Sequence, residues 1–169
     1  MTEQKSLPKR KHPRLDSFDY STCGAYFITI CTQGKRCILS NIVPSTAEDD
    51  AHAEYTTFGK IAEKQLLLLE ERYPILTVDQ FVIMPNHIHI ILLLRGDAAG
   101  ASPRPTVMDI ICTFKSLTAL ACKRAGFEGK LFQTSFYEHI IRNASDYDET
   151  KKYIYQNPAN WQKDNLFAE

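Results

Sequence analysis

The sequence lacks an excess of either charge, a pairing pattern among its cysteines, and any apolar run long enough to span a bilayer. Its 169 residues carry twenty basic and twenty acidic side chains, so composition alone does not indicate a nucleic-acid binder. The five cysteines are odd in number and form no CxxC pair, which argues against a zinc cluster and a disulfide framework. The longest apolar run, 88–94, is too short for a membrane span, and residues 1–14 are polar rather than a signal segment. We therefore expect one cytoplasmic domain spanning residues 1–169, without a membrane partner.

Charge is unevenly distributed along this neutral chain. Basic side chains crowd the N-terminal arm, residues 1–20, where Arg10, Lys11 and Arg14 are candidates for contacts with nucleic-acid phosphates. A solvated basic tail is the competing interpretation. Acidic residues concentrate in the segment 47–54, to which the sequence assigns no role.

The periodicity of the chain predicts the order strand, helix, strand, strand, helix, strand, helix. Runs of β-branched and aromatic residues predict the strands, and apolar residues at helical spacing predict the helices. The predicted strands are 25–32, 75–84, 86–95 and 136–142, and the predicted helices are 57–72, 107–125 and 146–156. The polar stretch 41–55 is predicted to be a loop. This order predicts an α+β fold of the ferredoxin-like β-α-β-β-α-β plan: an antiparallel sheet with two helices on one face, plus an added C-terminal helix.

Two histidines follow the Pro-Asn turn between the second and third predicted strands. Because side chains alternate along a strand, His87 and His89 are expected to project to one side and Ile88 to the other. Two imidazoles on one face are half of a possible metal site. Three interpretations stay open: histidines bonded to backbone or water, a hydrolytic metal site, and a metal site for phosphodiester chemistry.

The last predicted helix carries a phenol and an amide on one face, because Tyr153 and Asn157 are four residues apart. We expect this helix to begin near Asp146, with Glu149 completing a capping box. Two imidazoles and the Asn157 amide oxygen form an incomplete ligand set for Mg²⁺ or Mn²⁺, which leaves positions for phosphate oxygens and water. Pro158 is expected to strain Asn157 out of helical geometry.

Several segments, in order along nearly the whole chain, resemble the REP-associated tyrosine transposases, a family of the single-tyrosine HUH class (His-hydrophobe-His). The more specific matches are MPNHIH at 84–89, similar to the metal-binding motif of that family, and YIYQNP at 153–158, similar to its nucleophile helix. Weaker matches are DYSTCGAYFITICT at 19–32, FKS at 114–116, FQTSFYEHIIR at 132–142, and Trp161 and Asp164 in the tail.

The resemblance implies cleavage and rejoining of single-stranded DNA near palindromes that fold into hairpins. By that resemblance Tyr153 is the catalytic nucleophile, which forms a 5′-phosphotyrosine, and residues 143–169 are the nucleophile helix and tail. His87, His89 and Asn157 hold a divalent metal, Mg²⁺ or Mn²⁺, and the protein is cytoplasmic and associated with the nucleoid. Relatives in this class place Gln four residues after the tyrosine, where this chain has the shorter Asn157.

Three further residues are candidates for contacts with DNA, and two other functions compete with transposition. Lys115 and Ser116 lie beside the apolar stripe of the second predicted helix, and Arg142 ends the fourth predicted strand. One competing function is a non-catalytic protein that binds hairpin nucleic acids, and the other is a metal-dependent phosphodiesterase of small substrates. The sequence leaves a monomer or a homodimer open, because some relatives exchange the tyrosine helix between subunits. The short connection 142–146 favours a helix packed on its own sheet.

Overall fold

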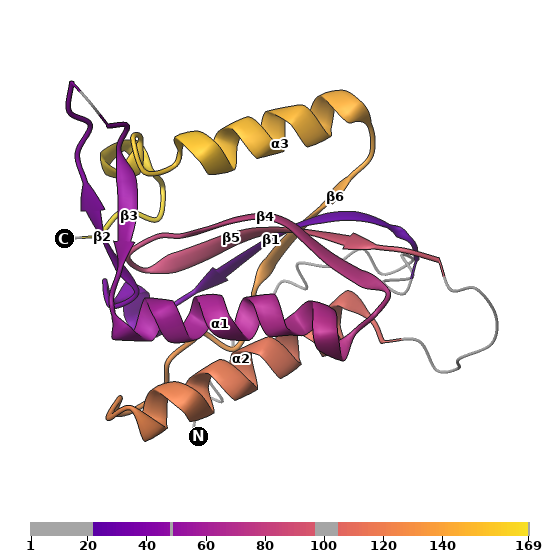
Figure 1. The fold of residues 1–169 in the computed structure, drawn as a ribbon, viewed down its shortest axis with the longest axis horizontal. Coiled ribbons are helices and arrows are strands. Elements are labelled where there is room, and N and C mark those ends of the chain that lie inside the picture. The colour runs from indigo at the N-terminus through magenta and orange to yellow at the C-terminus, as the bar shows by residue number, and fades with distance from the viewer. Residues whose placement is uncertain (1–21, 48, 97–104, 169) are drawn as a thin grey trace, which may run out of the picture.

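A four-stranded antiparallel sheet forms the centre of the molecule (Figure 1). The computed structural model describes residues 22–47, 49–96 and 105–168. The strands are β1 (Gly24–Cys31), β4 (Leu76–Ile83), β5 (His87–Leu94) and β6 (Tyr137–Ile141), in the order β4-β5-β1-β6. All neighbouring strands are antiparallel, which confirms the predicted ferredoxin-like plan.

The predicted turn between β4 and β5 places the histidines at the start of β5. Ile83 pairs with Ile88, and the backbone N–H of Met84 donates to the His87 carbonyl oxygen at 2.8 Å. The Pro85 carbonyl oxygen accepts hydrogen bonds from the backbone N–H groups of Ile38 and Leu39, both at 2.9 Å. Hydrogen bonds within the hairpin and from the segment before β2 therefore hold this turn, which restrains the position of the histidine pair.

Helices α1 (Thr57–Arg72) and α2 (Val107–Arg124) cover one face of the sheet (Figure 1). Thr56 caps α1, and Thr106 and Asp109 form a capping box at the start of α2. Their apolar stripes and the inward side chains of the strands, including Ile88 and Ile90, form the main core. These two helices agree closely with the predicted ranges.

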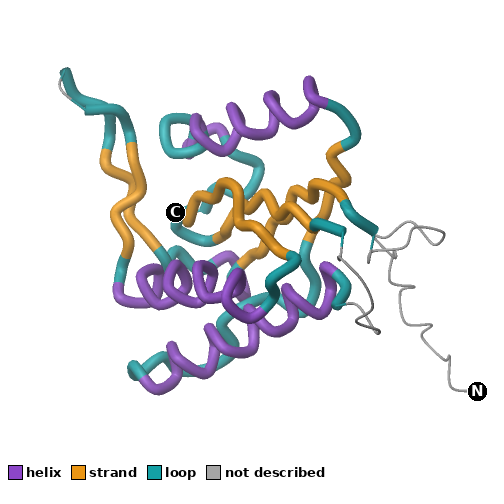
Figure 2. The backbone as a smooth tube through the Cα atoms, turned by 45° about the vertical axis from the view of Figure 1, so that its right-hand side comes forward, coloured by secondary structure: helices purple, strands orange, loops and turns teal. Residues whose placement is uncertain are grey.

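The prediction of a loop at 41–55 is wrong, because this stretch contains a β-hairpin. Strands β2 (Ser40–Val43) and β3 (His52–Tyr55) pair antiparallel in a separate two-stranded sheet. The hairpin stands apart from the main sheet and extends along the C-terminal end of helix α3 (Ala144–Gln156) (Figure 2). At its tip Asp50 accepts a hydrogen bond from the Tyr155 hydroxyl at 3.0 Å. Four-residue strands in an acidic segment carry little periodic signal, and this pair depends on contacts with distant residues.

Helix α3 lies on the face of the sheet opposite α1 and α2 (Figure 1). It is followed by a one-turn helix, η2 (Trp161–Lys163), and together they cover a smaller apolar cluster that includes Val82, Ile154 and Trp161. The predicted start of α3 is displaced: Asn143 is the cap, and its side chain accepts from the Asp146 N–H at 2.9 Å. Glu149 instead accepts a hydrogen bond from the Ser145 hydroxyl at 3.2 Å. In the described part of the chain, no helix has both the length and the apolar character needed to cross a bilayer.

Gly59 marks the closest approach of α1 to the strand connection before β2. A Cβ at this position would overlap the Leu39 carbonyl oxygen, which already accepts from the Thr56 N–H at 3.0 Å. We expect Gly59→Ala to lower the free energy of unfolding by about 1–3 kcal/mol, in spite of alanine's higher helix propensity. Urea denaturation measures this change. Gly96→Ala is the matched control, because its Cβ would only reach ordinary contact with Cys23 at 3.5 Å; equal effects of the two substitutions would contradict the prediction.

Candidate active site

His87 and His89 lie side by side on the face of β5 that points toward α3. Both are buried, with exposed fractions of 0% and 3%, and their ring centroids are 4.4 Å apart. Ile88 points into the main core on the other face. The predicted orientation of the two imidazoles is therefore confirmed.

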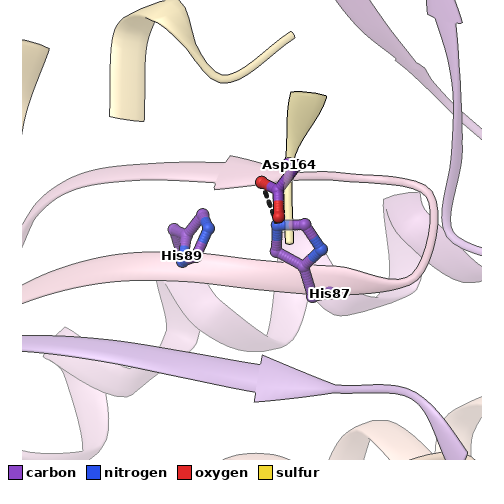
Figure 3. Close-up of side chains that lie close together, drawn as sticks. All are labelled: His87, His89 and Asp164. Atoms are coloured by element: carbon purple, nitrogen blue, oxygen red, sulfur yellow. Dashed lines mark ion pairs between the residues drawn. The ribbon is translucent and has the colours of Figure 1, made fainter. Parts of the chain in front are cut away.

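Asp164 completes a cluster with the two histidines (Figure 3). Its Oδ2 is 3.8 Å from His87 Nε2, and one ligand atom from each of the three residues lies within 4.8 Å of the others. The backbone N–H of Leu166 donates to Asp164 Oδ1 at 2.6 Å and orients the carboxylate. Reasoning from the sequence did not assign Asp164 as a ligand, because one aspartate in a polar tail has no spacing relation to the histidines.

Hydrogen bonds at Nδ1 hold both imidazole rings. Asn86 donates through Nδ2 to the Leu166 carbonyl oxygen at 2.8 Å, so its Oδ1 is the acceptor for His87 Nδ1–H at 2.8 Å. This arrangement leaves the Nε2 lone pair of His87 directed toward Asp164. His89 Nδ1 shares a hydrogen bond of 2.8 Å with the Thr29 hydroxyl. Each histidine thus presents Nε2 to the cluster.

Burial keeps the two imidazoles neutral. Burial lowers the pKa of His87 to about 4, although the nearby Asp164 carboxylate opposes this shift. Burial also lowers the pKa of His89 well below its ordinary value, and the neighbouring His87 lowers it further. Neutral imidazoles are the form that binds metal ions.

Tyr153 extends from α3 to this cluster. Its hydroxyl oxygen is 3.4 Å from His89 Nε2, and its ring stands edge-on to Phe27 at a centroid distance of 6.0 Å. The side chain is 46% exposed, so it reaches both the buried cluster and solvent. Burial raises the pKa of the phenol and the Asp164 carboxylate raises it further, so the hydroxyl is protonated at neutral pH. Tyr155 is 68% exposed and bonds to Asp50, away from the histidines.

Contacts between α3 and β4 set the position of this tyrosine. The Tyr147 hydroxyl donates to Asp79 Oδ2 at 2.7 Å, and the Gln80 side-chain amide donates to the Lys151 carbonyl oxygen at 3.3 Å. Lys151 also forms an ion pair with Asp79 at 3.7 Å. In this single chain the tyrosine helix is therefore packed on its own sheet, the arrangement that the short connection before it favours.

Asn157 lies beside the same cluster and is 2% exposed. Its Nδ2 donates to Asp164 Oδ2 at 3.1 Å, which links the end of α3 to the carboxylate. The prediction that Pro158 moves Asn157 out of helical geometry is wrong, because Asn157 has helical φ and ψ of −58° and −43°. Its N–H reaches the Ile154 carbonyl oxygen at 3.3 Å, so Pro158 begins a new turn and does not interrupt a hydrogen bond of α3.

The donor set fits a divalent cation. Among the described residues, His87 Nε2 and Asn157 Oδ1 are buried side-chain atoms that have no hydrogen-bond partner. Unpaired buried acceptors are costly, and a bound cation would satisfy them. Two imidazoles, a carboxylate and an amide oxygen are ligand types that divalent metals accept in proteins. His87, His89 and Asp164 could therefore bind a metal ion.

Known proteins resemble this chain in sequence and in fold. No protein-family model matches it. A protein of Haemophilus influenzae, itself uncharacterized, is 27% identical over 175 residues, which span 95% of this chain and 94% of that protein. The structure of a REP-associated tyrosine transposase bound to a REP hairpin matches with a TM-score of 0.59 and 23% identity, over 87% of this chain and 74% of the other. This chain has the fold of a REP-associated tyrosine transposase. A crystal structure of a candidate transposase from Deinococcus radiodurans R1 matches with a TM-score of 0.50 and 14% identity, over 85% of this chain and 95% of the other.

On this fold, none of the described residues predicted to contact DNA belongs to the cluster of His87, His89 and Asp164. The Lys115 ammonium donates to the carbonyl oxygens of Gln133 and Thr134 at 2.6 and 2.8 Å, so it ties α2 to the segment before β6. Ser116 is exposed on α2. Arg142 is exposed, and its backbone N–H donates to Asp146 Oδ2 at 3.1 Å. The contacts of these residues with DNA stay predictions, and Arg10, Lys11 and Arg14 lie outside the described residues.

Asn86 orients a candidate metal ligand, because its Oδ1 accepts from His87 Nδ1–H. We expect Asn86→Ala to weaken Mn²⁺ binding by about 10–100-fold, since the ring loses the partner that sets its tautomer and orientation. Isothermal titration of the DNA-free protein with Mn²⁺ measures this affinity. Asn160→Ala is the matched control, because Asn160 is exposed and its amide bonds only to the Gln156 carbonyl oxygen within the described chain. Equal affinities of the Asn86 variant and wild type would show that His87 does not depend on this bond.

Proposed function

We propose that this protein is a DNA transesterase of the REP-associated tyrosine transposase family, acting on single-stranded DNA near hairpins. The observation that carries the proposal is the position of the Tyr153 hydroxyl, 3.4 Å from His89 Nε2, beside the candidate metal cluster of His87, His89 and Asp164. A phenol at the edge of a candidate metal cluster is positioned as a nucleophile for attack on a phosphodiester. The fold, shared with a transposase whose structure was solved bound to a REP hairpin, supports the same reaction class.

In the proposed reaction Tyr153 Oη attacks the scissile phosphorus and the bond to the 3′-oxygen breaks. The phenol loses its proton, the leaving 3′-oxygen gains one, and the 5′ end of the DNA stays on the protein as a phosphotyrosine. A second 3′-hydroxyl reverses these steps and joins a new strand. One phosphodiester replaces another, so the reaction consumes no nucleotide cofactor.

His87, His89 and Asp164 are the proposed ligands of a divalent metal, Mg²⁺ or Mn²⁺, and the unpaired Oδ1 of Asn157 is a fourth. When bound, such a cation polarises a phosphodiester and offsets the negative charge that develops on it. The chain's own residues have separate tasks. Phe27 and His89 flank the Tyr153 ring and restrict its orientation, and Asn157 holds Asp164 through Nδ2.

The proposed partner is single-stranded DNA with a hairpin. A transposase of the same fold was solved bound to a REP hairpin, and the basic arm that contains Arg10, Lys11 and Arg14 supplies positive charge for the DNA backbone. Because the sequence recognised is unknown, we propose to incubate the protein and Mn²⁺ with single-stranded hairpins whose flanking nucleotides are randomised. Adducts that resist denaturation would then be isolated and their DNA sequenced.

Two labels distinguish the proposed reaction from its alternatives. A 3′-end label is expected to stay on the protein after denaturation, and a 5′-end label to be released on a shorter strand with a 3′-hydroxyl. Hairpin binding without any adduct or shorter strand would instead support a non-catalytic binder. Turnover of a small phosphodiester that is unchanged in Tyr153→Phe would support a phosphodiesterase.

A further inference from the structure

Lys35 has an unusual backbone conformation for its residue type. It ends the one-turn helix η1 (Gln33–Lys35) with φ of 55°, and among the described residues it is the one non-glycine residue with positive φ. A side chain with a Cβ is strained in this region, and such residues persist where surrounding contacts hold them. Strained residues of this kind concentrate at functional sites.

The contacts that hold Lys35 lead directly to the metal cluster. Its N–H donates to the Thr32 carbonyl oxygen at 3.1 Å, and its own carbonyl oxygen accepts from Asn86 Nδ2 at 3.3 Å. The same Asn86 side chain accepts from His87 Nδ1–H at 2.8 Å. The backbone of Lys35 is therefore part of the frame that orients His87.

The side chain of Lys35 places a positive charge at the Asp164 end of the cluster. Lys35 is partly buried as a residue, and its ammonium is 3.5 Å from the carbonyl oxygen of Asn165, the residue after Asp164, in an exposed contact. The Tyr153 hydroxyl approaches the cluster from the side of His89, 3.4 Å from its Nε2. An ammonium has three donors, and within the described chain Lys35 uses one of them, for a long bond to a neutral oxygen.

We propose that Lys35 forms a phosphate subsite that binds the first phosphate on the 5′ side of the scissile bond. The inference rests on the proposed function, in which Tyr153 attacks from the His89 end. In-line displacement directs the leaving 3′-oxygen away from the tyrosine, so the strand on the 5′ side of the break passes the His87–Asp164 end. The Lys35 ammonium is located there, and a charge-assisted bond to a non-bridging oxygen would hold that strand for the reverse reaction.

The test combines a change in the protein with a neutral methylphosphonate at single positions of the DNA. Lys35→Asn removes the charge and keeps a residue type that tolerates positive φ. We expect Lys35→Asn and a methylphosphonate at the first 5′ phosphate each to slow adduct formation about 10-fold or more. Together they should slow it no further than either alone, because both remove the same contact. Lys35→Arg should retain most of the rate, and Lys60→Gln, a remote cation on α1, should behave like wild type.

Additive effects of the two changes, or coupling to a phosphate on the 3′ side instead, would overturn the subsite. Hairpin binding in EDTA gives a second readout: Lys35→Asn should weaken it and reduce its salt dependence, and unchanged binding would count against the inference. Lys35→Gly accepts the left-handed backbone without strain and replaces Lys35→Asn if that variant does not fold. Failure of the wild-type protein to form any adduct would reject the proposed function. If the wild-type protein forms the adduct but the effects of Lys35→Asn and the methylphosphonate are additive, only this inference is rejected.

Discussion

Tyr153→Phe is expected to abolish the covalent protein–DNA adduct, with a loss of at least about 10⁴-fold in strand cleavage. The substitution removes the one oxygen that would attack phosphorus and leaves the ring against Phe27 and His89. Because Tyr153 is 46% exposed and its hydroxyl makes a long 3.4 Å contact, its loss should change stability little. The measurement is the amount of labelled oligonucleotide that stays on the protein after denaturation.

Tyr155→Phe is the matched control for this substitution. Tyr155 is on the same helix two residues away, and its hydroxyl bonds to Asp50 of the β2–β3 hairpin. It should form the adduct at the wild-type rate, while hairpin DNA binding stays intact in both variants. An adduct of normal yield in Tyr153→Phe would refute the assignment of the nucleophile, and loss in both variants would indicate a requirement for helix α3 itself.

Asp164→Asn is expected to weaken Mn²⁺ binding by at least about 100-fold and to slow DNA cleavage at the same metal concentration. The carboxylate is the one anionic member of the cluster, and its Oδ2 faces His87 Nε2 at 3.8 Å. The amide has nearly the same shape, and its oxygen can still accept from the Leu166 N–H, so the fold of the tail should be retained. Isothermal titration without DNA separates the loss of metal binding from any effect on the reaction.

Asp148→Asn is the control for Asp164→Asn, because Asp148 is exposed on α3. Among the described residues, it belongs to no cluster of side chains that could hold a metal ion. It should bind Mn²⁺ like wild type. If Asp164→Asn also binds like wild type, the third protein ligand must be sought in Asn157, whose buried Oδ1 is unpaired within the described chain. Excess Mn²⁺ should restore part of the cleavage lost in Asp164→Asn, which an unfolded variant would not show.

Some features of the candidate site follow from the local sequence, and others do not. The two-residue spacing of His87 and His89 places both on one face of any strand, and the four-residue spacing of Tyr153 and Asn157 does the same on any helix. Each pair was therefore predictable. The distance of 3.4 Å between His89 and Tyr153 joins residues that are far apart in the chain, and it follows from the docking of α3 on β4.

Asp164 and Lys35 show where local pattern carried no signal. Asp164 reaches the cluster because η2 returns the chain toward β5 and the Leu166 N–H turns the carboxylate inward. Lys35 depends on the contact between its carbonyl oxygen and Asn86, a residue in another turn. The local pattern around Lys115 also did not show that its ammonium donates to three carbonyl oxygens of residues 133–135.

The sequence by itself determined the order of the four strands of the main sheet and of the three long helices, and the shared face of each pair of candidate residues. These depend on periodicities of 2 and 3.6 residues, which neighbours along the chain encode. Only the tertiary structure decided that α3 covers the face of the histidines, that residues 40–55 form a β-hairpin, and that Asp164 joins the cluster. Those features depend on burial of the apolar cluster around Ile154 and Trp161 and on hydrogen bonds between distant segments, which no local period records.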